Sequence, residues 1–199
     1  MRKLSVNTFL TLDGVMQAPG GPDEDTSGGF TYGGWSVNYW DEKMGEIMDD
    51  YMGKPFDLVL GRKTYEIFAG YWPQATNDAA KPLNDATKNV ASRTLGAVDW
   101  QNSFLIEGDV VEGVAALKKQ DGPELQIHGS GNLIQALLPH NLIDEFRLWM
   151  FPLVVGSGKR LFADGTVPSR LKLVDSIVST TGVMMGTYVP AGDIETGSF

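Results

Sequence analysis

Short apolar runs alternate with amphipathic segments along this chain, and this alternation constrains the fold more than any other feature of the sequence. The runs Leu4–Leu12, Asp57–Leu60 and Leu125–His128 have the composition of strands. The segment Trp40–Tyr51 carries apolar residues at helical spacing, and Asp109 is placed to cap a second helix. Because parallel strands need a crossover connection, the pattern predicts an α/β fold with a mostly parallel sheet and helices on both faces.

The last third of the sequence has a different pattern. The strand-like runs Glu145–Val155, Lys172–Val178 and Gly182–Val189 are joined by loops that contain Gly and Pro, with no helix between them. Such runs are typical of antiparallel strands, so we expect them to extend one edge of the sheet. No linker or internal repeat divides the chain, and we expect a single domain over residues 1–190 followed by a flexible tail over residues 191–199.

The charge and the cysteine count exclude several classes of function. The chain has 16 Lys plus Arg against 25 Asp plus Glu, a formal net charge of −9, so it lacks the basic surface that nucleic acids and anionic membranes require. The absence of cysteine excludes thiolate nucleophiles and zinc–cysteine sites, and two histidines do not suggest a metal site. The sequence shows neither a signal peptide nor an apolar span of about 20 residues. We therefore expect a soluble, cytoplasmic protein that binds a small molecule and no metal.

Three segments at the ends of predicted strands favour anion binding. Gly61–Thr64 combines a glycine, which lets a ligand approach the backbone, with two cations and the start of a helix. Ser92 and Arg93 place a hydroxyl beside a guanidinium, a pair that can hold the phosphate monoester by which NADP differs from NAD. Gly129–Asn132 lies between a strand and a helix, as a pyrophosphate loop does, although Ile134 stands where the third glycine of the Rossmann pattern belongs. Taken alone, Gly61–Thr64 is equally compatible with a glycine turn that carries solvated basic residues, and the common Ser92-Arg93 pair favours an ordinary turn.

Five further residues are candidates for substrate binding or proton transfer. Asp13 follows the first predicted strand, where a carboxylate can hydrogen-bond an aminopyrimidine or relay a proton; the alternative is an Asp-Gly turn. Trp35 is expected either to stack on a flat ring or to pack in the core, and Asp41 either to hold the substrate or only to stabilise a helix start. Gly158 and Lys159 belong to a loop that holds a substrate phosphate or is simply a tight turn.

Five motifs occur along the chain in the order found in the dihydrofolate-reductase-like superfamily. They are Thr11–Gly14, Leu60–Glu66, Ser92-Arg93, His128–Gly131 and Phe151–Phe162. The sequence most closely resembles the reductase domain at the C-terminal end of the bifunctional riboflavin-biosynthesis deaminase-reductase and its stand-alone relatives. This resemblance covers nearly the whole chain. It implies a three-layer dihydrofolate-reductase-like fold, an NADPH-dependent reductase and a homodimer.

The resemblance also implies roles for individual residues. Those matched to the cofactor are Gly61, Arg62, Lys63, Thr64, Ser92, Arg93, Gly129, Ser130, Gly131 and Asn132, and Asp13 is matched to catalysis. Gly61–Glu66 looks more like the dihydrofolate-reductase branch, whereas the loop around Gly158 looks like the riboflavin branch. The expected substrate is therefore a pterin or an aminopyrimidine, with 5-amino-6-(5-phosphoribosylamino)uracil as one candidate.

Other functions and roles fit the same residues. A non-catalytic protein that binds a nucleotide or a pterin would use this fold without turnover, and a flavin oxidoreductase would use the same cleft. The Gly- and Pro-rich stretch Pro19–Gly34 is compatible with a lid over a ligand and with a solvated loop. His128 is interpreted as a hydrogen-bonded structural residue, with a cofactor contact as the alternative.

Overall fold

The computed structural model describes residues 1–199, which form an α/β fold around one eight-stranded sheet. The strands are β1 Leu4–Thr11, β2 Phe56–Gly61, β3 Lys88–Ala91, β4 Ser103–Leu105, β5 Glu124–His128, β6 Glu145–Phe151, β7 Leu171–Val178 and β8 Met184–Pro190. The helices are α1 Glu42–Met52, α2 Arg62–Tyr71, α3 Ala80–Asp85, α4 Val110–Lys119 and α5 Gly131–Leu137.

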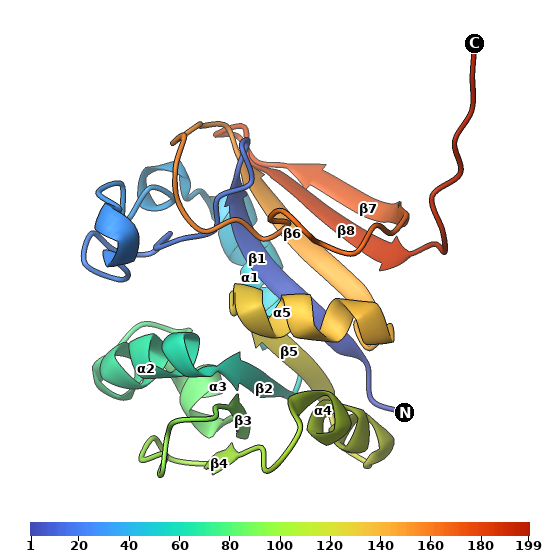
Figure 1. The fold of residues 1–199 in the computed structure, drawn as a ribbon. Coiled ribbons are helices and arrows are strands. Elements are labelled where there is room, and N and C mark those ends of the chain that lie inside the picture. Colours follow the sequence, from blue (N-terminus) through green and yellow to red (C-terminus); the bar gives the residue numbers. More distant parts are fainter.

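From edge to edge the strands lie in the order β4-β3-β2-β5-β1-β6-β8-β7. All pairs from β4 to β6 are parallel, whereas β8 runs antiparallel to both β6 and β7. The prediction of a mostly parallel sheet with an antiparallel C-terminal edge is confirmed. One consequence matters for function: the carboxyl ends of β1, β2, β3 and β5 all meet at the same side of the molecule (Figure 1).

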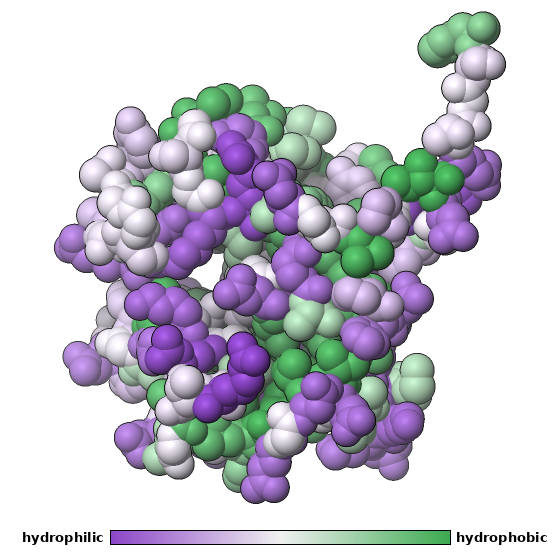
Figure 2. Space-filling model, in the orientation of Figure 1, coloured by the Kyte–Doolittle hydropathy of each residue, from purple (hydrophilic) through white to green (hydrophobic).

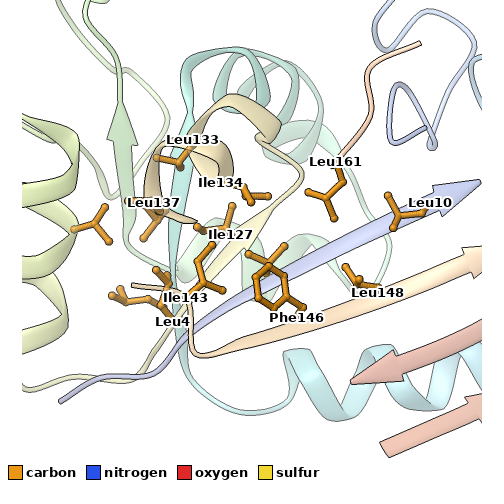
Figure 3. Close-up of a cluster of buried hydrophobic side chains, with 14 residues drawn as sticks. Leu4, Leu10, Ile127, Leu133, Ile134, Leu137, Ile143, Phe146, Leu148 and Leu161 are labelled. Atoms are coloured by element: carbon orange, nitrogen blue, oxygen red, sulfur yellow. The ribbon is translucent and has the colours of Figure 1, made fainter. Parts of the chain in front are cut away.

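Helices cover both faces of the sheet, which gives three layers (Figure 1). Helices α4 and α5 pack on one face around the cluster of Figure 3, in which Ile134 and Leu137 of α5 contact Leu4 and Phe146 of the strands. The side chains of α1, α2 and α3 belong to two other buried clusters, which cover the opposite face. None of the helices combines the length and the apolar character that crossing a membrane requires.

Side-chain caps decide where the predicted helices begin. Asp109 Oδ1 accepts the backbone N–H of Val111 at 2.9 Å, so α4 starts where its capping pattern predicts. The side chain of Asp41 accepts the N–H of Met44 at 2.9 Å, which makes Asp41 the N-cap of α1. The helix expected from Trp40 therefore begins at Glu42 instead.

Two other boundaries differ from expectation for local reasons. Strand β6 ends at Phe151 and not at Val155, because Pro152 has no N–H to donate to a neighbouring strand. Helix α3 was not predicted: it has six residues, of which only Ala80 and Leu83 are buried, too few to produce a visible period.

The long loop after β1 is held in place by its own hydrogen bonds. Gln17 Nε2 donates to the carbonyl oxygens of Asp25 at 3.0 Å and Ser27 at 2.9 Å. The indole N–H of Trp35 donates in turn to the carbonyl of Gln17 at 2.7 Å. The stretch Pro19–Gly34 is therefore attached to the body of the domain through Asp25, Ser27 and the buried Phe30, although most of its residues are exposed.

Candidate functional site

A cavity of about 940 Å³ opens at the carboxyl ends of β1, β2, β3 and β5. Ligand cavities in proteins have volumes of roughly 300–1,000 Å³, so this one can hold a dinucleotide-sized or smaller ligand together with water. Figure 2 shows the hollow between the loop that follows β1 and the lobe that carries α2. The predicted cofactor residues all line it: Gly61, Arg62, Lys63, Thr64, Ser92, Arg93, Gly129, Ser130, Gly131 and Asn132.

The junction of β2 and α2 presents free backbone donors to this cavity. Gly61 is the N-cap of α2 and has no side chain to cap it, so the first N–H groups of the helix lack a side-chain partner. Ser130 fixes this junction from the neighbouring strand: its Oγ accepts the N–H of Gly61 at 3.0 Å and lies 2.9 Å from Thr64 Oγ1. The two glycine-containing segments that the sequence predicts as anion sites are thus joined by one hydroxyl group.

The turn between β5 and α5 has an unusual backbone conformation and packs closely against the side chain of Met16. Gly129 and Ser130 both have left-handed φ angles, of +57° and +61°. A Cβ at Gly131 would lie 3.2 Å from Met16 Sδ, so any larger side chain there would require Met16 to move. This close packing places the backbone of the turn directly against the cavity.

Ser92 and Arg93 lie just past the end of β3 and line the cavity. Ser92 Oγ accepts the N–H groups of Thr94 at 3.1 Å and Leu95 at 3.0 Å, which leaves its own hydrogen free to donate. Arg93 is exposed and forms no ion pair. This pair therefore offers one O–H and one unpaired guanidinium to an anion.

The other cations of the cavity differ in how far their charge is already neutralised. Lys63 has no ion-pair partner, and Arg62 is 3.8 Å from Glu66 with half of its side chain exposed. Lys159, by contrast, forms an ion pair of 2.5 Å with the buried Asp25. Unpaired positive charge is thus concentrated beside the ends of β2 and β3.

The inner part of the cavity lies along the sheet beneath α1. Its apolar side chains include Phe9, Met48 and Trp149, and the rings of Phe9 and Trp149 stack at 5.1 Å. His128 also lies here. Burial lowers its pKa to about 4, with a further contribution from the nearby charge of Arg147, so the imidazole is neutral at pH 7.

Four of the residues expected at the substrate side do not line the cavity, and each has another partner. Asp13 accepts hydrogen bonds from Thr11 Oγ1 at 2.6 Å and from the backbone N–H of Gly156 at 2.8 Å. Trp35 is buried, with its ring edge-on to Phe151.

The remaining two, Asp41 and Gly158, have equally specific packing roles. Asp41 Oδ2 accepts the N–H of Thr180 at 2.7 Å, which attaches the start of α1 to the turn before β8. Gly158 adopts φ +133°, and a Cβ there would approach Val15 to 2.7 Å. Of the residues expected at the substrate side, only Lys159 reaches the cavity.

Among the cavity residues that were not singled out from the sequence are three polar ones on the central strands: Asn7, Gln126 and Arg147. Each lies in the middle of a strand, where a polar residue between apolar neighbours was the only available signal. Register supplies the missing information, because Asn7 of β1 is the direct neighbour of His128 on β5 and of Arg147 on β6.

The parallel sheet, the glycine turns and the basic strand ends together define a dihydrofolate-reductase-like fold with a cleft at the carboxyl ends of its strands. The chain belongs to the family described as the RibD C-terminal domain, whose sequence model matches residues 2–185. The predicted family resemblance is confirmed.

Individual relatives agree with this assignment. The chain is 30% identical over 192 residues to the uncharacterized protein YyaP of Bacillus subtilis (strain 168), covering 94% of each chain. A pyrimidine reductase-like protein from Corynebacterium diphtheriae has a similar structure, with a TM-score of 0.63 at 13% identity, over 96% of this chain and 93% of that one. Dihydrofolate reductase from Enterococcus faecalis, solved with NADP(H), gives a TM-score of 0.57 at 17% identity, over 94% and 96%. At these identities the two structures support the fold alone.

Proposed function

We propose that the protein is an NADPH-dependent reductase of a small heterocyclic substrate of pyrimidine or pterin type. Membership of the RibD C-terminal domain family supports a reductase. The names of two structural relatives, a pyrimidine reductase-like protein and a dihydrofolate reductase solved with NADP(H), support the substrate class and the cofactor.

The observation that carries the proposal is the convergence of three strand ends on one cavity. Gly61–Thr64, Ser92-Arg93 and Gly129–Asn132 are far apart in the sequence and line the same cavity. NADPH carries its negative charge in two places, the pyrophosphate and the 2′-phosphate. The cleft likewise offers anion donors in two places, at the linked β2 and β5 ends and at the end of β3.

Each cofactor-binding residue has a definable task in this proposal. The free N–H groups at the start of α2 and the glycine turn before α5 would hold the pyrophosphate, with Lys63 adding charge. Ser92 and Arg93 would hold the 2′-phosphate through the hydroxyl hydrogen and the guanidinium. The bound cofactor would supply the hydride, and the chain's contribution would be to hold the substrate ring against it.

The carboxylate of Asp13 does not reach the cavity, so we assign it no contact with the substrate. Its oxygen atoms are held by Thr11 and by the backbone at Val155 and Gly156. The hydrogen bond from Thr11 is the main reason why the pKa of Asp13 is lowered, and a strong acid of this kind is a poor proton donor at neutral pH. We propose that the proton needed for reduction comes from water.

A thermal-shift comparison tests the cofactor assignment. NADPH should raise the melting temperature of the protein more than NADH does, because only NADPH carries the 2′-phosphate. Arg93→Ala should remove this difference, and Lys172→Ala, at an exposed site on β7, should retain it. Equal stabilisation of the wild type by both cofactors, or by neither, would contradict the proposal.

The second candidate function is a protein that binds a nucleotide or a pterin without turnover. It is favoured by one observation: the three acidic side chains that line the cavity are already engaged within the protein, Asp25 by Lys159, Asp109 as the N-cap of α4, and Glu24 by backbone N–H groups of its own loop. Consumption of NADPH with any member of a pyrimidine and pterin panel would eliminate it.

We further propose that the chain forms a homodimer through the β7–β8 edge. The outer side of this edge exposes Leu173, Val174, Val178 and Met184, each with about half of its surface accessible. Adjacent exposed apolar side chains of this kind mark protein interfaces. Light scattering should give twice the chain mass of 21.7 kDa for the wild type and the chain mass for Val178→Glu. A monomeric wild type would contradict the proposal.

A further inference from the structure

The hydroxyl group of Ser130 joins two strand ends at which the backbone ladder has already stopped. Strands β2 and β5 pair only as far as Leu58 and Gln126. Beyond that point, Ser130 Oγ accepts the backbone N–H of Gly61 at 3.0 Å. This one side chain therefore connects the end of β2 to the turn that follows β5.

The hydrogen of the same hydroxyl group is also used within the protein. Ser130 Oγ donates to Thr64 Oγ1 at 2.9 Å, and a second acceptor, the carbonyl oxygen of His128, lies at 3.3 Å. Since a serine hydroxyl has a single hydrogen, none is left for a ligand. Although Ser130 lines the cavity, its hydroxyl group therefore serves the walls of the cavity rather than a bound molecule.

The backbone at Ser130 shows that a side chain at this position has a cost. Its φ and ψ angles, +61° and +48°, are left-handed, a conformation that residues other than glycine rarely adopt. Gly129 adopts a similar φ, of +57°, without strain. A glycine in place of Ser130 would likewise avoid the strain, so the serine is explained by what its hydroxyl group contributes.

Thr64 is the residue to which this contribution passes. It lies in the first turn of α2 and lines the cavity. Because Thr64 Oγ1 accepts from Ser130, its own hydrogen points away from Ser130, where it is free to donate to a ligand. Gly61 N–H, Ser130 and Thr64 thus form one directed chain, in which each hydrogen bond strengthens the next.

We propose that Ser130 is a positioning residue for the cofactor. Its hydroxyl group holds the two halves of the pyrophosphate site together and turns the Thr64 hydroxyl towards the anion, whereas the Ser130 side chain itself does not contact the cofactor. This inference rests on the proposed function, within which it separates the residue that donates to the pyrophosphate from the residue that orients the donor.

Calorimetric titration with two probes tests the inference without a substrate. NADPH carries both the pyrophosphate and the 2′-phosphate, whereas adenosine 2′-monophosphate carries only the 2′-phosphate, for which Ser92 and Arg93 are the proposed donors. Ser130→Ala should weaken NADPH binding about tenfold, the loss expected for one well-placed hydrogen bond. Binding of adenosine 2′-monophosphate should stay as in the wild type, because the end of β3 is unchanged.

Two further variants separate the hydroxyl group from other properties of the residue. Ser130→Gly also removes the hydroxyl but relieves the left-handed strain, so it should fold no less well than Ser130→Ala and bind NADPH equally weakly. Ser103→Ala is the matched control, since Ser103 Oγ is buried without a partner on β4, outside the cavity. This control should bind both probes as the wild type does.

A double-mutant cycle tests whether Ser130 acts through Thr64. Thr64→Val removes the donor that Ser130 orients and should itself weaken NADPH binding at least about tenfold. In this background Ser130→Ala should cause a further loss of no more than about threefold, because the effects of coupled residues do not add. A second loss as large as in the wild-type background would overturn the positioning role.

The other outcomes separate this inference from the proposed function. Unchanged NADPH binding by Ser130→Ala or by Ser130→Gly, or an equal loss of binding for both probes, would overturn the positioning role and leave the cofactor assignment in place. A wild type that does not bind NADPH would overturn both.

Discussion

At the scale of single residues, the structure separates the residues that line the cavity from those that hold the surrounding loops in place. Asp13 illustrates the second group. Its carboxylate accepts hydrogen bonds from Thr11, Val155 and Gly156, and Arg160 lies 3.8 Å away. The motif that resembles the family's catalytic segment thus serves here to attach the turn after β1 to the loop after β6.

Replacement of Asp13 by Asn should lower the free energy of unfolding by about 1–2 kcal/mol at pH 7, because an amide nitrogen would face one of the three donors. Folding lowers the pKa of the Asp13 carboxyl group below its usual value of 3.8. The ionised carboxylate therefore stabilises the folded state fully above pH 3.8, and this stabilisation is lost as the pH falls through the lower pKa of the folded state. Urea unfolding at decreasing pH should show that the difference in the free energy of unfolding between the wild type and Asp13→Asn becomes smaller in acid. Asp164→Asn, at an exposed site, is the control; an equal effect in both variants would contradict the assignment.

The imidazole of His128 should not titrate between pH 5 and 8, because burial lowers its pKa to about 4. The chain has two histidines, so the variant His140→Gln leaves a single imidazole to follow by NMR. The unfolded chain binds this proton near pH 6.5 and the folded chain near pH 4, so stability is lost as the pH falls through that interval. A titration midpoint of the His128 imidazole near pH 6.5 in the folded protein would contradict the assignment of a neutral imidazole at pH 7.

At the scale of elements, the sequence predicts most strands and helices because their periods and caps are local. The strand cores of β2 and β5 and the start of α4 are examples, since each depends on residues adjacent in the chain. The end of β6 and the existence of α3 were not predicted, because Pro152 stops the strand within a longer apolar run and α3 is too short to show a helical period. The role of Gly158 also depends on contacts with residues distant in sequence, Val15 and Phe30.

Replacement of Gly158 by Ala should destabilise the loop that follows β6. The new Cβ would lie 2.7 Å from Val15 Cγ1 and 3.0 Å from Phe30 Cε2, at φ +133°, so we expect a cost of about 1–3 kcal/mol. Gly156→Ala is the matched control: it also has a positive φ, of +80°, but no atom lies within 4 Å of its Cβ. Denaturant unfolding should show a larger loss for Gly158→Ala, and equal losses would indicate that packing against Val15 and Phe30 is unimportant.

At the scale of the whole molecule, topology creates the cleft from segments that the sequence shows only separately. The three anion-binding segments were predicted individually, and their convergence follows from the strand order, which places β3, β2 and β5 side by side. The alignment of Asn7 with His128 and Arg147 on neighbouring strands could not be predicted in the same way, because the sequence alone does not give the register of three strands. The net charge of −9 does not oppose an anionic cofactor, since the unpaired cations Lys63 and Arg93 lie at one edge.

The most direct test of the central claim is a crystal structure of the protein with NADP⁺ bound. Our account predicts the 2′-phosphate against Ser92 and Arg93, the pyrophosphate between the start of α2 and the turn at Gly129–Asn132, and the nicotinamide directed to the inner wall near His128. A cofactor bound elsewhere, or a 2′-phosphate directed away from Arg93 into solvent, would contradict it.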